Sequence, residues 1–168
     1  MKTLPFTCIL ALTFLLSPAS STARAAEGDD NIYNYLQLFR SDLNSAKVEV
    51  VNQVMKLSAA DAQRFWPLYR QYELELGKLA ISRTELIAEF VEAHKNGTFD
   101  NAHAKEIARR WFQTQRARLK LLEKYHGKIQ KALSPIQAGQ FLQIENQIAI
   151  FMDMAIASEM PMVGQAPR

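Results

Sequence analysis

The chain has 168 residues, of which 48% are hydrophobic and 22% charged, and it has a formal net charge of +3 at pH 7. Its one cysteine is Cys8, near the N-terminus, so the rest of the chain can form neither disulfides nor thiolate metal sites. Stability must therefore come from packed apolar surface, and the near balance of acidic and basic residues gives no indication of a nucleic-acid partner.

Residues 1–25 have the layout of a secretory signal peptide. Lys2 is followed by an apolar run from Leu4 to Leu16 and then by small residues that end in Ala23-Arg24-Ala25, which is the pattern that signal peptidase accepts. The apolar run is shorter than the roughly 20 residues of a transmembrane helix. We therefore expect cleavage near Ala26 and a soluble protein in the periplasm.

The next residues predict a polar leader over 26–32 and then one helical domain over 33–158. Glycine and proline are almost absent from this domain. A first helix is expected from Tyr33 to Met55, with apolar residues at helical spacing. Ser58 is a natural N-cap for a second helix, and Asp61 completes a capping box three residues later.

Three further boundaries follow from cap and breaker residues. The second helix should end near Lys95, because Asn96-Gly97 supplies a left-handed residue. Asp100 can cap a third helix that runs to about Ala132. Ser134-Pro135 then gives the N-cap and first residue of a fourth helix to about Ser158, and residues 159–168 should form a flexible tail.

The second helix carries apolar residues in two heptad rows, which predict a long buried seam. The third helix carries its apolar residues on one face. We therefore expect an all-α fold in which helices two and three form an extended antiparallel hairpin, and the shorter helices one and four fold against it. The rows are Phe65, Tyr72, Leu79 and Leu86, then Tyr69, Leu76, Arg83 and Phe90; the face of the third helix is Ile107, Trp111, Leu122, Tyr125 and Ile129.

Two short motifs open helices in the same way. Leu133-Ser134-Pro135-Ile136-Gln137 fits the pattern LTxxQ with Ser for Thr, and Leu57-Ser58-Ala59-Ala60-Asp61 fits it with a further change of Gln to Asp. The motif residues are Leu57, Ser58, Asp61, Leu133, Ser134 and Gln137. In a helical exported chain, this pair resembles the LTxxQ periplasmic family, which includes the chaperone Spy and the stress accessory protein CpxP. The segments 64–69 and 140–146 also resemble a broad group of exported helical proteins without an established activity.

The resemblance implies a bowed helical dimer that shields non-native proteins without ATP, or a related function in envelope stress. Its implied partners are non-native proteins or an envelope stress sensor, with a homodimer as the oligomer. The motif residues would then be structural helix starts. Two alternatives stay open: a metal-responsive periplasmic protein that binds Cu(I) or Zn, and a purely structural envelope component.

Signatures of catalysis are missing from the sequence, which predicts neither an enzyme nor a cofactor. There is no phosphate-binding glycine loop, nucleophile elbow or HExxH motif. The histidines His94, His103 and His126 are scattered and lack the spacing or carboxylate partners of a helical metal site. Two Met-x-Met pairs, at Met152, Met154, Met160 and Met162, could bind Cu(I), although packing is the favoured interpretation.

Two further rows of residues are candidate partner surfaces. Basic residues follow one side of the third helix at Arg109, Arg116, Lys120, Lys124 and Lys131. Export argues against nucleic acid as the ligand, which leaves acidic proteins or weak contact with an anionic membrane surface. A second apolar row on helix two contains Pro67, Leu74, Ile81 and Ala88. It could meet another helix of the chain, a dimer partner or a client, and packing within the chain is the favoured reading.

Charged residues also occur on faces that should be buried. Glu145 lies on the apolar face of the fourth helix, while Arg83 and Arg118 lie on those of the second and third. An unpaired buried charge is costly. We therefore predict an internal ion cluster in which Glu145 meets Arg118, Arg83 or both, and so holds helix four to the hairpin.

Overall fold

The structure is a computed structural model that describes residues 47–164. These residues are mostly helical and include no strand, so the fold is all-α as predicted. Residues 47–55 form a short helical segment before three long helices, α2 (Ala59–Lys95), α3 (Asn101–Ala132) and α4 (Pro135–Glu159). The predicted signal peptide, the leader and the first part of the first helix lie outside the described residues.

The predicted N-caps are confirmed at all three long helices. Ser58 Oγ accepts from the backbone N–H of Asp61 at 3.1 Å, and Ser134 Oγ accepts from that of Gln137 at 3.2 Å. Asp100 Oδ1 accepts from the N–H of His103 at 2.9 Å. Each bond satisfies a donor that the first turn of a helix leaves without an intrahelical partner.

The helix ends also agree with the predictions to within one residue. α2 ends at Lys95, and Gly97 has a φ of +65°, the left-handed conformation expected there. α4 ends at Glu159, one residue later than predicted. A feature without a sequence signal is Lys56, whose φ of +44° ends the segment 47–55 in a conformation that glycine adopts more easily.

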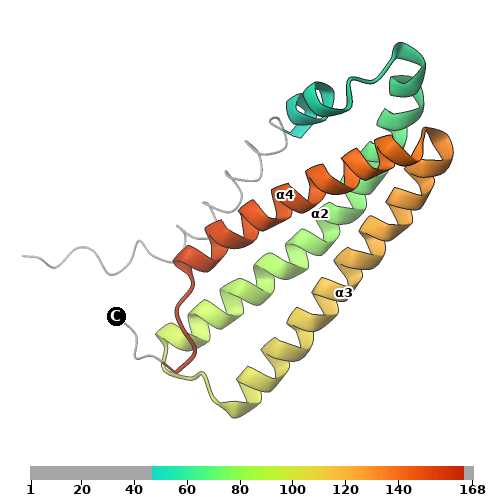
Figure 1. The fold of residues 1–168 in the computed structure, drawn as a ribbon. Coiled ribbons are helices and arrows are strands. Elements are labelled where there is room, and N and C mark those ends of the chain that lie inside the picture. The colour runs from blue at the N-terminus through green and yellow to red at the C-terminus, as the bar shows by residue number, and fades with distance from the viewer. Residues whose placement is uncertain (1–46, 165–168) are drawn as a thin grey trace, which may run out of the picture.

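α2 and α3 form an antiparallel hairpin, and α4 runs back beside it (Figure 1). α3 packs against both α2 and α4. The main core lies toward the end where α3 turns into α4, and segment 47–55 contributes to it. Its fully buried members from these elements are Val51, Phe65, Tyr72, Tyr125, Ile129, Ala138 and Phe141.

Two of the predicted packing faces need correction. Leu74 and Ile81 are not covered by the helices that the structure describes, because their exposed fractions are 72% and 52%. Trp111 shares the inward side of α3 with Leu122 and Tyr125, but it is half exposed because it lies beyond the main core. Within residues 47–164, no helix is both long enough and apolar enough to span a bilayer.

Candidate functional site

The two Leu-Ser motifs meet at the same end of the bundle. Ser58 donates to Asp61 Oδ2 at 2.9 Å, and the side-chain amide of Gln137 donates to the same oxygen at 3.3 Å. Ser134 in turn donates to Gln137 Oε1 at 2.9 Å. The N-caps of α2 and α4 are therefore joined in one hydrogen-bonded chain, and these residues act as structural links.

The carboxyl group of Asp61 carries the negative charge at this junction. Hydrogen bonds from Ser58 and Gln137 hold the pKa of its carboxyl below the usual value, and the paired Arg64 adds to the effect. Leu57 and Leu133, the first residues of the two motifs, are partly buried against the core. Each motif thus combines one apolar contact with one cap.

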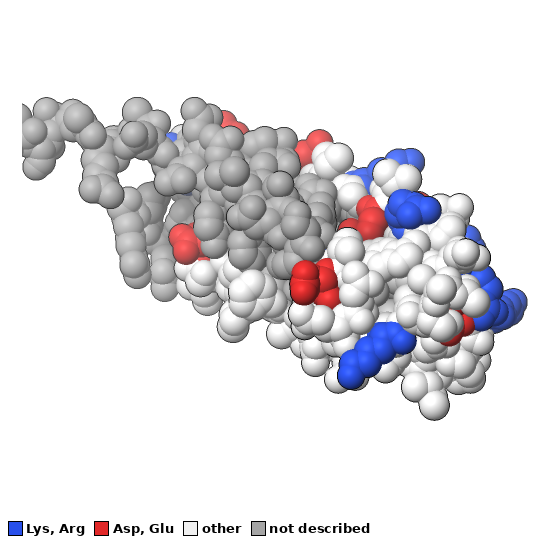
Figure 2. All heavy atoms as spheres, turned by 90° about the horizontal axis from the view of Figure 1, so that it is seen from above, with Lys and Arg blue, Asp and Glu red and all other residues white. Residues whose placement is uncertain are grey.

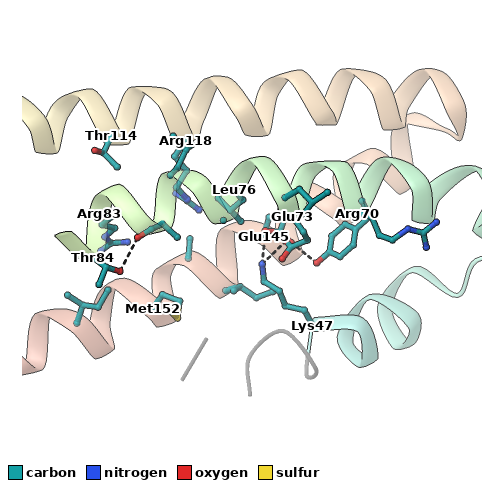
Figure 3. A pocket seen from close by; sticks show the side chains of 18 of the residues that line it. Lys47, Arg70, Glu73, Leu76, Arg83, Thr84, Thr114, Arg118, Glu145 and Met152 are labelled. Atoms are coloured by element: carbon teal, nitrogen blue, oxygen red, sulfur yellow. Dashed lines mark hydrogen bonds and ion pairs between the residues drawn. The ribbon is translucent and has the colours of Figure 1, made fainter. Parts of the chain in front are cut away.

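A second polar cluster surrounds Glu145 inside the bundle. This carboxylate is buried, with only 2% of the side chain exposed. The hydroxyls of Tyr69 and Tyr72, both on α2, donate to it at 3.0 and 2.9 Å. Lys47 Nζ lies 3.4 Å from Glu145 Oε2 and 2.9 Å from Glu73 Oε1. Glu145 therefore ties α4 to α2 and to segment 47–55 (Figure 3).

The predicted partners of Glu145 are wrong, although its burial and linking position agree with the prediction. Arg83 pairs instead with Asp153 of α4, at 2.6 Å. Arg118 makes no hydrogen bond or ion pair with Glu145 in the described part of the chain. Its positive charge nevertheless acts on the hydroxyl of Tyr72, where it lowers the pKa against a larger opposing effect of burial.

The sequence does contain signals for the true partners of Glu145. Tyr69 and Tyr72 are three residues apart and face the core, so their hydroxyls needed an acceptor. Lys47 lies four residues before Val51 and eight before Met55, on the buried side of its segment. A lysine at such a position requires a carboxylate partner.

Burial and the charge of Glu145 keep both tyrosines protonated. Burial, followed by the nearby carboxylate, raises the pKa of Tyr69 and Tyr72 far above the usual value. Tyr125 of α3 is also buried and donates to Glu75 Oε1 at 2.7 Å, and its pKa is raised to about 12. All three therefore act as hydrogen-bond donors over the ordinary pH range.

We expect the fold to lose stability at alkaline pH, because these three tyrosines must stay protonated to donate their hydrogen bonds. A tyrosine whose pKa is higher in the folded than in the unfolded chain contributes stability that is present below about pH 10 and is lost as the pH rises through the folded value. The free energy of unfolding should fall by up to about 1.4 kcal/mol per pH unit for each such tyrosine. Denaturant titrations between pH 8 and 11, followed by helical circular dichroism, measure this loss.

Tyrosinate absorbance supplies the control for that experiment. Tyr69 and Tyr72 should ionise only as helical structure is lost, and Tyr72→Phe should reduce the absorbance change that accompanies unfolding. Absorbance that rises fully while the circular dichroism stays native would contradict the buried hydrogen bonds.

A cavity of about 820 Å³ lies beside the Glu145 cluster, between α2 and α4. The two helices meet through long side chains there, and α3 contributes Thr114 and Arg118 to the lining (Figure 3). The lining is mostly apolar. Its apolar members include Leu76, Leu79, Ile87, Ile148, Met152 and Ile156. This volume is in the range of small-molecule binding sites.

The basic stripe of α3 is exposed and partly engaged in ion pairs. Arg109 pairs with Glu106 at 2.5 Å, and Lys124 pairs with Glu75 of α2 at 2.7 Å. Arg116 and Lys120 are also exposed. Solvated side chains of this kind contribute little free energy to folding, and the structure adds no contact that would assign a ligand to the stripe.

Candidate metal ligands do not converge in the described region. Within residues 47–164, no three His, Cys, Asp or Glu side chains come together in a way that could hold a metal ion. His103 does have a carboxylate neighbour, contrary to the prediction, since its Nδ1 lies 2.7 Å from Asp100 Oδ1. Met152 lines the cavity, whereas Met154 and Met162 are exposed.

Comparison with known proteins gave no relative. No family model, curated protein or solved structure matches the chain. The LTxxQ resemblance therefore stays a prediction that rests on the two motifs.

Proposed function

We propose that the protein is a non-enzymatic binding protein of the periplasm that shields apolar segments of non-native polypeptides. The observation that carries the proposal is the row formed by Leu74 and Ile81. Both side chains are large, apolar and exposed on one side of α2, and Leu74 also lies at the edge of the cavity. Exposed apolar side chains that form a row are typical of interaction surfaces.

Other parts of the described surface also suit such a ligand. On the face that Figure 2 shows, uncharged residues cover wide areas between scattered charged side chains. On α4, Ile150, Phe151 and Met154 add further exposed apolar side chains. Contact with these surfaces would be reversible without nucleotide hydrolysis, because it requires only the transfer of apolar groups from water. The rigid helices would provide a preformed surface at little cost in entropy.

An aggregation assay tests the proposal. The wild-type protein should slow the aggregation of a chemically unfolded client, and Leu74→Asp should weaken this protection at least severalfold because it places a charge in the apolar row. Leu119→Asp is the matched control, since Leu119 is 65% exposed but lies on α3. It should leave protection nearly unchanged.

Sedimentation of the same variants separates client binding from self-association. The resemblance implies a homodimer, and the row on α2 could serve as its interface. If Leu74→Asp turns a dimer into a monomer while protection stays intact, the row binds a second copy and the proposal for clients is wrong.

A further inference from the structure

We propose that the cavity between α2 and α4 binds a single-chain fatty acid, with Arg118 as the partner of its carboxylate. Arg118 projects from α3 into the cavity (Figure 3). It is half-buried, and it makes no hydrogen bond or ion pair with any described residue. An arginine in such surroundings offers a planar set of N–H donors that matches a carboxylate.

The other cations of the lining are either engaged or exposed. Lys47 is shared between Glu73 and Glu145 at one end of the cavity, and Arg83 is paired with Asp153. Arg70 is exposed, and its side chain points away from the cavity (Figure 3). The carboxylates of Glu73 and Glu145 disfavour binding of an anion at the end of the cavity where Lys47 lies. Arg118 is therefore the cation that a buried carboxylate of a ligand would meet.

The rest of the cavity suits an apolar chain. Beyond Arg118, toward the C-terminal end of α4, the lining includes Ile87, Met152 and Ile156. Along α4 the lining extends from Glu145 to Ile156, which lies eleven positions later and so about 17 Å further along the helix axis. An elongated space with Arg118 as its unpaired, half-buried cation and mostly apolar walls beyond it favours a linear ligand with one anionic end.

Calorimetric titration of the full-length protein tests this inference. The probes are a saturated fatty acid and the alcohol of the same chain length, both kept below the concentrations at which they aggregate. The wild type should bind the acid saturably at one site and more tightly than the alcohol. Arg118→Gln should weaken binding of the acid at least about tenfold, as expected when a charge-assisted hydrogen bond is lost, and should change binding of the alcohol little.

Two further variants make the result specific to the cavity. Arg116→Gln removes an exposed arginine from the same helix and should leave both affinities unchanged. Ala149→Phe should weaken both ligands, because Ala149 lines the apolar part of the cavity. Thermal melts confirm that each variant is folded.

Several results would overturn the inference: no saturable binding by the wild type, equal affinities for acid and alcohol, or an equal loss in Arg116→Gln and Arg118→Gln. The aggregation assay contains no amphiphile. Failure of fatty-acid binding is therefore distinguishable from failure of polypeptide binding.

Discussion

Replacing Lys47 with Met should lower the free energy of unfolding by about 3 to 5 kcal/mol, because it leaves a buried carboxylate without its cation. Only 7% of the Lys47 side chain is exposed, and its ammonium group lies between Glu73 and Glu145. Two tyrosine hydroxyls would still donate to Glu145, so the lower end of this range is expected. Denaturant unfolding measures the change.

Lys124→Met is the matched control for this prediction. Lys124 also pairs with a glutamate, but 46% of its side chain is exposed, so the change should cost less than about 1 kcal/mol. The double variant Lys47→Met/Glu145→Leu should be more stable than the two single changes predict when added. Additive effects would mean that Lys47 and Glu145 do not stabilise each other.

Phe141→Ala should have an effect of similar size, about 3 to 5 kcal/mol. Phe141 is buried on α4, and its ring meets those of Tyr69 and Tyr72 edge to face, with centroids 6.3 and 5.2 Å away. The change removes these contacts and leaves a cavity between α2 and α4. Its effect is again measured by denaturant unfolding.

The control for Phe141 is a phenylalanine outside the core. Phe112 of α3 is 53% exposed, so Phe112→Ala should cost less than about 1 kcal/mol. Equal costs for the two variants would show that α4 is not held by the aromatic cluster.

The helix boundaries were predictable from the sequence because they depend on local chemistry. Ser58, Asp100 and Ser134 each offer an oxygen to the first turn of a helix, and Gly97 permits the left-handed residue at the end of α2. These effects act over a few residues and need no knowledge of packing.

The partners of Glu145 depended on how helices far apart in the sequence face one another. Helical spacing places Glu145 on a buried face of α4. It does not decide whether Arg83 or Lys47 meets this carboxylate, because that depends on how α4 is placed along the other helices. The register of α4 brings Asp153 to Arg83 and Glu145 to Tyr69 and Lys47. A shift of one turn, about 5.4 Å, would have changed these pairs.

The exposure of Leu74 and Ile81 was missed for a related reason. Spacing identifies a row of apolar residues, but it does not show whether another helix covers that row. The sequence also lacked a signal for the cavity, since a cavity arises from the separation of α2 and α4 and not from any one segment.

Site-specific photo-crosslinking tests the proposed function most directly. A photoreactive amino acid placed at position 74 should form a covalent product with an unfolded client. The same group at position 119 should form little, because Leu119 is similarly accessible but lies on α3 and not in the row on α2. A native client should give no product at either position. Equal products at positions 74 and 119, or none at 74, would contradict the proposal that this row holds non-native polypeptides.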